Sequence, residues 1–151
     1  MATPAGAAAA QTLVAVRRAR DLIDRHYAEP LDLDRLAQAA GYSRYHFVRA
    51  FRAAYGETPG RYLTRRRIER AQELLRSANL TVTEVCHVVG FSSLGSFSSL
   101  FTEFAGVSPS RFQRAAHQRG GPPPIPGCYV LMWGVPRKSA ITEKPPSADG
   151  A

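Results

Sequence analysis

One short segment carries side chains that could bind a polyanion and read its chemistry. The stretch "SRYHFVRAFRAAYG", residues 43–56, opens with a serine that can cap a helix and closes on a glycine that can end one. Helical spacing places Phe47, Ala50, Phe51 and Ala54 on one side. The opposite side then carries Arg44, Tyr45, Val48, Arg49 and Arg52.

The exposed side of this predicted helix suits the major groove of B-DNA. The groove admits one helix, arginine can pair bidentately with guanine there, and valine could contact a thymine methyl group. A solvated charged face is the alternative interpretation, but a tyrosine and a valine are unusual on such a face. The pattern therefore favours insertion of this exposed face into the major groove.

The segment belongs to one copy of an internal repeat. "GYSRYHFVRAFRAAYGETPGRYL" starts at residue 41, and "GFSSLGSFSSLFTEFAGVSPSRF" starts at residue 90. Their glycines, phenylalanines and prolines align, with one extra residue just after the turn of the second copy. Each copy is typical of a helix-turn-helix followed by the start of another helix. Two copies would let a single chain contact two successive major grooves, about one helical turn apart.

The outward face of the second copy differs in chemistry from that of the first. It is predicted to carry Leu94, Gly95, Ser96, Ser98, Ser99 and Thr102, with no arginine. Small hydroxyl groups can contact bases and phosphates, but they discriminate little between sequences. We therefore expect the first copy to dominate and the second copy to make an accessory contact.

Further polar side chains are predicted to contact phosphates. They are Ser43, Arg52, Arg61, Arg65, Arg66, Ser92, Thr102 and Arg111. For Arg66 and Arg70, ordinary helix solvation with Glu69 and Glu73 as partners stays open as an alternative. Arg67 lies near the inner stripe of the same helix and is predicted to brace the two modules.

The elements that position these faces are all helical. We expect an all-α fold of about seven helices, in which two helix-turn-helix modules are joined by a long linker helix. The domain is predicted over residues 13–119, with module one at 13–57, the linker helix at 58–78 and module two at 79–119. It is flanked by a flexible Ala-rich N-terminus, residues 1–12, and a Pro/Gly-rich tail with disordered ends, residues 120–151.

The composition agrees with a polyanionic partner. The 151-residue chain has a formal net charge of +8 and a sequence pI of about 10.2. Charge alone leaves nucleic acid, an anionic membrane surface or an acidic protein open as partners. The N-terminus resembles neither an export signal nor a membrane span, and two cysteines make no disulfide framework, so we expect a cytoplasmic protein. Cys86 lacks partners at zinc spacing and is predicted to pack in the core, and no metal or cofactor is expected.

Several stretches of the chain match one known pattern. They are "LDLDRLAQAAGYSRYHFVRAFRAAYGETPGRYL", the linker pattern Arg67-x-x-x-Ala71-x-x-Leu74-Leu75, "TVTEVCHVVGF", and the Ser, Phe, Gly and Ser-Pro spacing of the second copy. In these the chain, over about residues 13–117, resembles the AraC/XylS family of bacterial transcriptional regulators. The resemblance implies seven helices, insertion of the second helix of each module into adjacent major grooves, and contact with RNA polymerase. In module one it assigns base reading to Tyr45, Val48 and Arg49, with Arg44 alongside. In module two the corresponding positions are Leu94, Gly95, Ser96, Ser98 and Ser99.

Two departures from the family pattern fall in the second copy. The family commonly has arginine where this chain has Ser99, and lysine or arginine where it has Thr102. Its closing Tyr-Arg is Phe112-Gln113 here. The layout is similar to the small stand-alone regulators of the family. Because one chain carries two modules, we expect a monomer on double-stranded DNA.

The apolar segment "IPGCYVLMWG", residues 125–134, is unusual within the tail. We expect it to pack back on the domain as an extended segment. A docking strip for a protein or a small-molecule lid stays open, and Cys128 could be redox-sensitive if exposed.

Two other functions compete with a sequence-specific transcription regulator. One is a protein-interaction module that keeps the fold but binds DNA only weakly. The other is a repair alkyltransferase that uses this domain for DNA targeting, which needs an activated cysteine. Since neither cysteine lies in an evidently activating setting, we expect no enzymatic activity.

Overall fold

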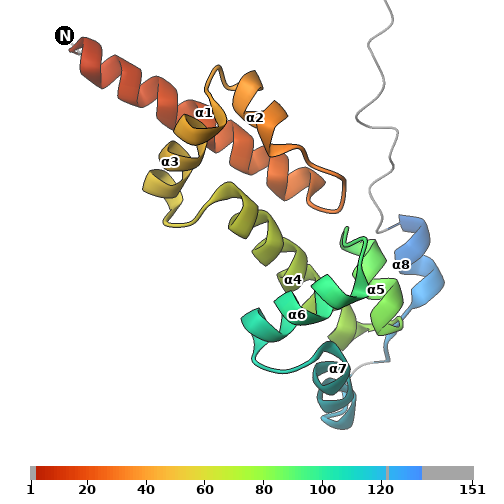
Figure 1. Cartoon of the computed structure of the whole chain (residues 1–151). Helices are drawn as coiled ribbons and strands as arrows, with labels where there is room; N and C mark the ends of the chain where they lie inside the picture. The colour runs from red at the N-terminus through yellow and green to blue at the C-terminus, as the bar shows by residue number, and fades with distance from the viewer. Residues whose placement is uncertain (1–2, 122, 134–151) are drawn as a thin grey trace, which may run out of the picture.

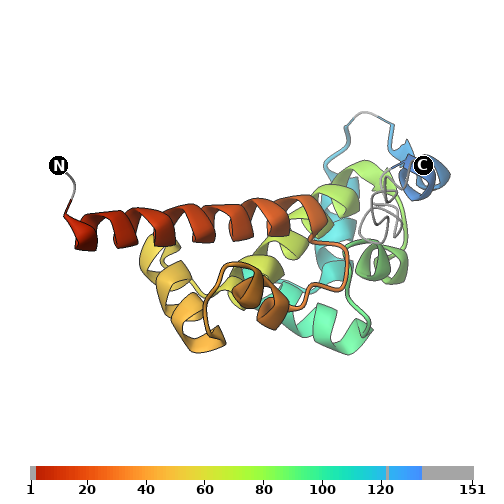
Figure 2. The same ribbon diagram turned by 90° about the horizontal axis from the view of Figure 1, so that it is seen from above.

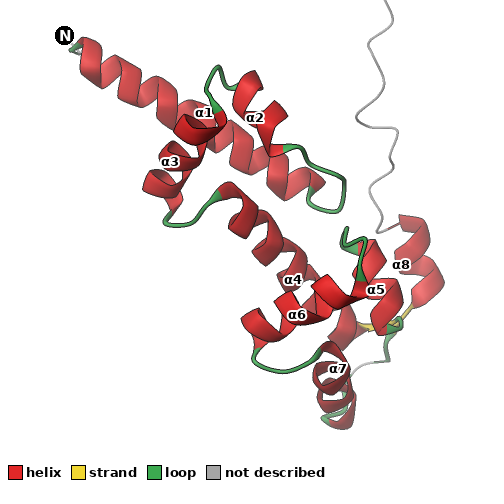
Figure 3. Ribbon diagram, viewed as in Figure 1, coloured by secondary structure: helices red, strands yellow, loops and turns green. Residues whose placement is uncertain are grey.

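Eight helices and one pair of very short strands make up the described part of the chain. The structure is a computed structural model, and it describes residues 3–121 and 123–133. The elements are α1 (Pro4–His26), α2 (Leu33–Ala39), α3 (Arg44–Tyr55), α4 (Pro59–Ser77), β1 (Ala78–Asn79), α5 (Val82–Val88), α6 (Leu94–Ala105), α7 (Pro109–Gln118), β2 (Ile125–Pro126) and α8 (Gly127–Trp133) (Figure 1). The predicted all-α fold is confirmed (Figure 3).

The first helix is longer than the sequence suggested. Helix α1 begins at Pro4 and not near Leu13, so the prediction of a flexible N-terminus is wrong for the residues that the structure describes. Thr3 caps the helix by accepting a hydrogen bond from an amide of the first turn, where proline is also favourable. The alanines that suggested a loose segment have the highest helix propensity of all residues. Residues 4–11 are exposed and extend past α3 (Figure 2), so propensity rather than packing holds them.

Helices α2 and α3 form the first helix-turn-helix and pack with α1. Asp32 caps α2, and Ser43 caps α3 as predicted. Gly41, in the turn between them, has a φ of 79°, a left-handed conformation that glycine adopts without steric cost. The core of this module contains Val16, Ala19, Ile23, Ala37, Phe47, Phe51, Tyr62 and Leu63.

Helix α4 links the two modules and belongs to both cores. Thr58 caps it and Pro59 lies in its first turn, close to the start predicted for the linker helix. Tyr62 and Leu63 in its first half pack in the core of module one. The apolar side chains from Ile68 onward pack in the core of module two. The linker is therefore a structural part of each module.

Helices α5 and α6 form the second helix-turn-helix, and α7 closes the module. Thr81 and Glu84 make a capping box, in which each side chain accepts a hydrogen bond from the backbone amide of the other. The core of this module contains Ile68, Ala71, Leu74, Leu75, Ala78, Leu80, Val85, Cys86, Val89, Phe97, Phe101 and Val130. The predicted core position of Cys86 is thus confirmed.

The tail folds back onto module two. Strand β2 pairs in parallel with β1, and α8 follows at once. The predicted packing is confirmed, but the predicted extended conformation is wrong beyond the two strand residues. Helical geometry explains the difference, because it buries Val130 in the core while Tyr129, Leu131 and Met132 stay exposed. Residues 134–151, which include the end predicted to be disordered, lie outside the described residues.

Candidate nucleic-acid interface

Helix α3 presents an exposed aromatic and basic face. Tyr45 is 71% exposed, and the guanidinium carbon of Arg49 lies 5.5 Å from the centroid of its ring, within cation–π distance. Arg44 is exposed and pairs with Asp34 of α2, with Nε 3.4 Å from Oδ1. Val48 is half-buried. The four base-reading candidates of module one therefore lie on one turn and a half of the same helix.

Sequence reasoning missed two residues of this surface. His46 lines a shallow groove of about 400 Å³ together with Tyr45 and Arg49, and its ring centroid lies 4.8 Å from that of Tyr42. Its place at the edge of the exposed stripe was the only signal in the sequence. Asp34 lies on another helix, so its pairing depends on tertiary approach, and no local pattern could have found it.

Hydroxyl groups at the start of both outward helices act as caps. Ser43 Oγ accepts a hydrogen bond from the His46 amide at 3.2 Å, and Ser93 Oγ accepts one from the Ser96 amide at 3.3 Å. A hydroxyl group that accepts at a cap can still donate its hydrogen to a phosphate, as predicted for Ser43. Ser92, which precedes the second cap, is exposed. Arg52, near the end of α3, is also exposed.

Helix α6 presents a face with no basic residue. Its outward candidates Leu94, Gly95, Ser96 and Ser99 are exposed, and Ser98 is half-buried. The Thr102 hydroxyl donates to the carbonyl of Ser98 at 2.7 Å, so a phosphate contact by Thr102 would have to replace this bond. The surface that α6 offers is thus small, hydroxylated and uncharged over its first turns.

An ion pair joins α6 to the linker helix. Arg61 Nη1 lies 2.8 Å from Glu103 Oε1, and the same guanidinium lies 4.6 Å from the centroid of the Phe104 ring. The two charged side chains are 51% and 52% exposed, so the pair is solvent-screened and Arg61 can still approach a phosphate. Arg111, the other phosphate candidate of this module, is exposed in the first turn of α7.

The linker arginines Arg65 and Arg66 are paired with carboxylates. Arg65 lies 2.6 Å from Glu57 and 2.6 Å from Glu69, while Arg66 lies 3.0 Å from Asp24 and 2.8 Å from Glu69. The hydrogen bond with Glu57 is the main reason that the pKa of Arg65 is raised. These contacts favour a bracing role for both arginines over the phosphate contacts that the sequence suggested.

The same network ties the linker to α1. The Tyr62 hydroxyl donates to Asp24 at 2.6 Å, and burial together with this bond raises the pKa of Tyr62 to about 12. Burial would raise the pKa of Glu69, but the hydrogen bonds from Arg65 and Arg66 outweigh that effect and lower it. Ion pairs and hydrogen bonds thus fix the orientation of α4 against module one.

The described residues give little support to the alternative of a repair alkyltransferase, which needs an activated cysteine. Cys86 is buried, and burial raises the pKa of its thiol, which disfavours the nucleophilic thiolate. Cys128 is exposed on α8. Within residues 3–121 and 123–133, no group of three His, Cys, Asp or Glu side chains could hold a metal ion. None of the described helices is long and apolar enough to span a bilayer.

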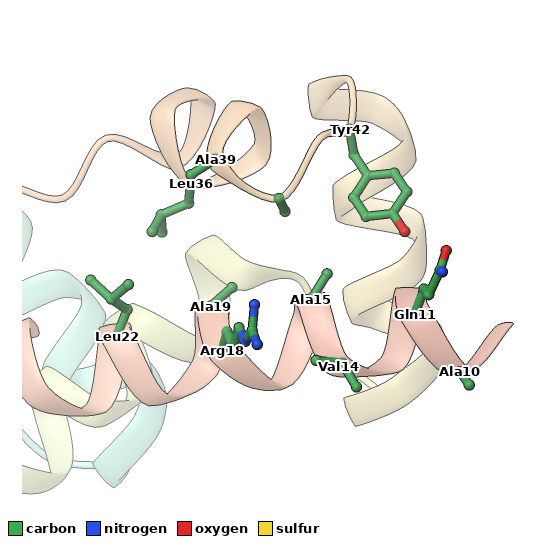
Figure 4. Close-up of a pocket in the computed structure, with 11 residues that line it drawn as sticks. Ala10, Gln11, Val14, Ala15, Arg18, Ala19, Leu22, Leu36, Ala39 and Tyr42 are labelled. Atoms are coloured by element: carbon green, nitrogen blue, oxygen red, sulfur yellow. The ribbon is translucent and has the colours of Figure 1, made fainter. Parts of the chain in front are cut away.

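A separate apolar groove of about 600 Å³ runs between α1 and α2 (Figure 4). Leu22 and Leu36 line it from opposite helices, and Tyr42 closes one part of its wall. Leu22 is 43% exposed, because α2 is too short to cover all of α1. The lining is mostly apolar, so the groove adds nothing to the basic surface of α3.

The arrangement of the two modules matches known DNA-binding proteins. A family model described as a helix-turn-helix domain matches residues 36–115 of this chain. A solved transcriptional regulator from Chromobacterium violaceum, of the AraC-type DNA-binding domain-containing proteins, is 28% identical with a TM-score of 0.63, covering 74% of this chain and 99% of that one. The chain belongs to the AraC-type helix-turn-helix family. This family consists of DNA-binding transcription regulators, and the resemblance stated from the sequence is confirmed.

Other AraC-type relatives cover the same region. The transcriptional regulator GbdR of Pseudomonas aeruginosa is 35% identical over 124 residues, which are 80% of this chain and 33% of GbdR, so this chain spans about a third of the length of that relative. The transcriptional activator AarP of Providencia stuartii is 36% identical over 91 residues, 60% of this chain and 67% of AarP. The DNA-binding domain of AdpA, solved in complex with a target DNA, is 31% identical with a TM-score of 0.66, covering 69% of this chain and 94% of that domain.

Proposed function

We propose that this AraC-type chain is a sequence-specific transcription regulator that inserts α3 and α6 into adjacent major grooves of DNA. The observation that carries the proposal is the pair of equivalent, exposed helices in one chain, of which α3 is aromatic and basic. A single helix fits the major groove, and exposed arginines can pair with guanine there. The AdpA domain, which has the same fold, binds a target DNA.

Module one supplies most of the sequence discrimination in this proposal. Its base readers are Arg44, Tyr45, Val48 and Arg49. The weaker base contacts of module two are Leu94, Gly95, Ser96, Ser98 and Ser99. The phosphate contacts are Ser43, Arg52, Arg61, Ser92, Thr102 and Arg111. Arg65 and Arg66 are assigned no DNA contact. Their ion pairs with Glu57 and Asp24 orient the linker helix against module one.

The proposal also covers the oligomeric state, the protein partner and the localisation. One chain offers two reading helices, so it binds as a monomer. Contact with RNA polymerase is proposed from the family resemblance, and AarP is described as a transcriptional activator. The protein acts in the cytoplasm at the nucleoid and catalyses no reaction, in keeping with the buried thiol of Cys86.

The test is selection from a random-sequence DNA pool at two salt concentrations, with an Arg49→Ala protein as the matched control. We expect an enriched site with two half-elements about 10 bp apart, since that is one helical turn. The half-element read by α3 should be lost with Arg49→Ala.

Two other results would change the assignment. A single short element would mean that α3 reads DNA while α6 only steadies the complex. No enrichment, with binding that disappears at modest salt, would leave a weak polyanion binder and favour the protein-interaction module. The exposed apolar side chains Tyr129, Leu131 and Met132 of α8 would then be the first surface to probe.

A further inference from the structure

The two modules meet at a junction centred on Arg67 of α4. Its Nη2 donates to the carbonyl of Glu29 at 2.9 Å, and its Nε donates to the carbonyl of Tyr27. Both carbonyls belong to the loop that follows α1, so Arg67 holds module one. The same guanidinium lies 5.7 Å from the centroid of the Phe91 ring in module two. Arg67 therefore contacts both modules, as the bracing role predicted from the sequence requires.

The backbones of the two modules also touch at this junction. A Cβ atom on Gly90 would lie 2.8 Å from the carbonyl oxygen of Ala28 and 3.0 Å from its carbonyl carbon. Real Cβ atoms essentially never lie that close to a backbone oxygen, so any residue larger than glycine would force the two backbones apart. Gly90 lies in the turn before α6, whereas Ala28 follows α1, the helix that packs against α3.

The repeat provides an internal control for this contact. Gly41 is the equivalent residue of module one, and it also has a positive φ, 79° against 99° for Gly90. A Cβ atom on Gly41 would meet nothing within 4 Å. The conformational reason for glycine is thus common to both positions. The steric reason exists only at Gly90, where the opposite module approaches.

We propose that Arg67 and Gly90 are positioning residues that set the separation of the two reading helices, and with it the spacing between half-elements that the protein accepts. Gly90 permits the close approach of its backbone to Ala28. Arg67 holds the loop that contains Ala28 through the carbonyls of Tyr27 and Glu29. This inference rests on the proposed function, in which α3 and α6 both contact DNA. It assigns spacing specificity to two residues that need not touch DNA.

The first experiment measures the separation of the modules in the free protein. Spin labels are attached at Ala53→Cys on α3 and Ser110→Cys on α7, both exposed positions, in a Cys128→Ser background. Cys86 is buried and should stay unlabelled. We expect Gly90→Ala to shift or broaden the electron–electron distance distribution relative to the unsubstituted background, and Gly41→Ala to leave it unchanged. Equal distributions for the two glycine variants would overturn the proposal.

The second experiment measures spacing on DNA. The selected site is synthesised with its half-elements at the selected spacing and with one base pair added or removed. We expect the native protein to lose affinity by about tenfold or more on the altered sites, as for a mismatched base pair. Gly90→Ala should reduce this discrimination to about threefold or less, and Gly41→Ala should retain it. If Gly90→Ala discriminates as sharply as the native protein, the proposal is wrong.

Arg67 variants keep the test informative should Gly90→Ala fail to fold. Arg67→Met keeps the packing volume but loses both carbonyl contacts, and Arg67→Lys can restore one of them. The expected order of spacing discrimination is native, then Lys, then Met; the same discrimination in all three would refute the clamp. If the native protein itself shows no preference for any spacing, the proposed binding of DNA by both modules is wrong. The spin-label distances still show whether Arg67 and Gly90 fix the separation of the two modules.

Discussion

Helices α3 and α6 occupy equivalent places in the repeat, and their buried faces are alike while their exposed faces are not. Each begins at a serine cap, buries two phenylalanines and ends at a left-handed glycine. Their exposed sides differ: α3 offers arginine and tyrosine, whereas α6 offers glycine, serine and threonine. The comparison teaches that the fold constrains one side of each helix and leaves the other free to diverge. Three sets of matched substitutions test this difference between the buried and the exposed sides, and a fourth prediction concerns the linker helix.

The largest expected effect tests the buried sides. Phe47 and Phe97 are both 0% exposed, in the cores of module one and module two. We expect Phe47→Ala and Phe97→Ala each to lower the free energy of unfolding by about 3–5 kcal/mol, as for other buried aromatic residues. Urea denaturation of both variants measures this. A loss at one site several times larger than at the other would break the equivalence of the two cores.

The exposed sides are compared at one matched position. Arg49 of α3 corresponds to Ser99 of α6 in the repeat. We expect Arg49→Ala to weaken binding to the selected site by about 1–3 kcal/mol, because a bidentate arginine–guanine pair is lost. Ser99→Ala should cost no more than about 0.5 kcal/mol. Equilibrium titration of labelled DNA at one fixed salt concentration tests both; equal losses would make α6 a full reader.

A second matched position tests charge alone. Arg52 of α3 corresponds to Thr102 of α6. Arg52→Gln should reduce the slope of log affinity against log salt by about 0.9, since one fewer phosphate is neutralised. Thr102→Gln should leave the slope unchanged, whereas Thr102→Arg should raise it by a similar amount. The salt series is best run on a non-cognate duplex, where base contacts contribute little. A change of this slope with Thr102→Gln would contradict the prediction that α6 neutralises no phosphate charge.

The smallest effect concerns ion pairs within the linker helix, where Glu69 pairs with Arg65 and Arg66. The pKa of Glu69 is lowered in the folded protein, so its stabilising contribution is present above its unfolded pKa and is lost as pH falls through the folded value. Its side chain is 40% exposed, which limits the contribution to about 0.3–0.5 kcal/mol. Glu69→Gln should remove this part of the acid sensitivity. Unfolding curves of both proteins at neutral pH and near pH 3–4 measure the difference, and identical pH profiles would exclude the pair as a source of stability.

The features that the sequence predicted well are local. Asp32, Ser43 and Thr58 act as caps because a cap needs only the next three residues. The buried side of each outward helix followed from helical spacing in the same way. The start of α1 was missed because an alanine-rich stretch is compatible with both a loose terminus and a helix. The composition alone does not distinguish the two states.

The features that could not be predicted depend on tertiary approach. Arg66 meets Asp24 of α1, and Arg61 meets Glu103 of α6, each more than forty positions away in the chain. The sequence alone showed neither partner, of which Asp24 makes phosphate binding by Arg66 unfavourable, while the exposed pair with Glu103 leaves Arg61 accessible. The close contact of Gly90 with Ala28 is equally invisible, because Gly41 has the same local setting without it.

Helix α4 supplies side chains to both hydrophobic cores, and this has a consequence for how the protein melts. Loss of either core would leave half of α4 unsupported, and a half-helix of that length is marginal in water. The chain should therefore unfold in one cooperative transition and cannot be divided into two independent readers. If α3 binds DNA as proposed, the free energy of that binding would also protect α6 from unfolding, because the two helices unfold together.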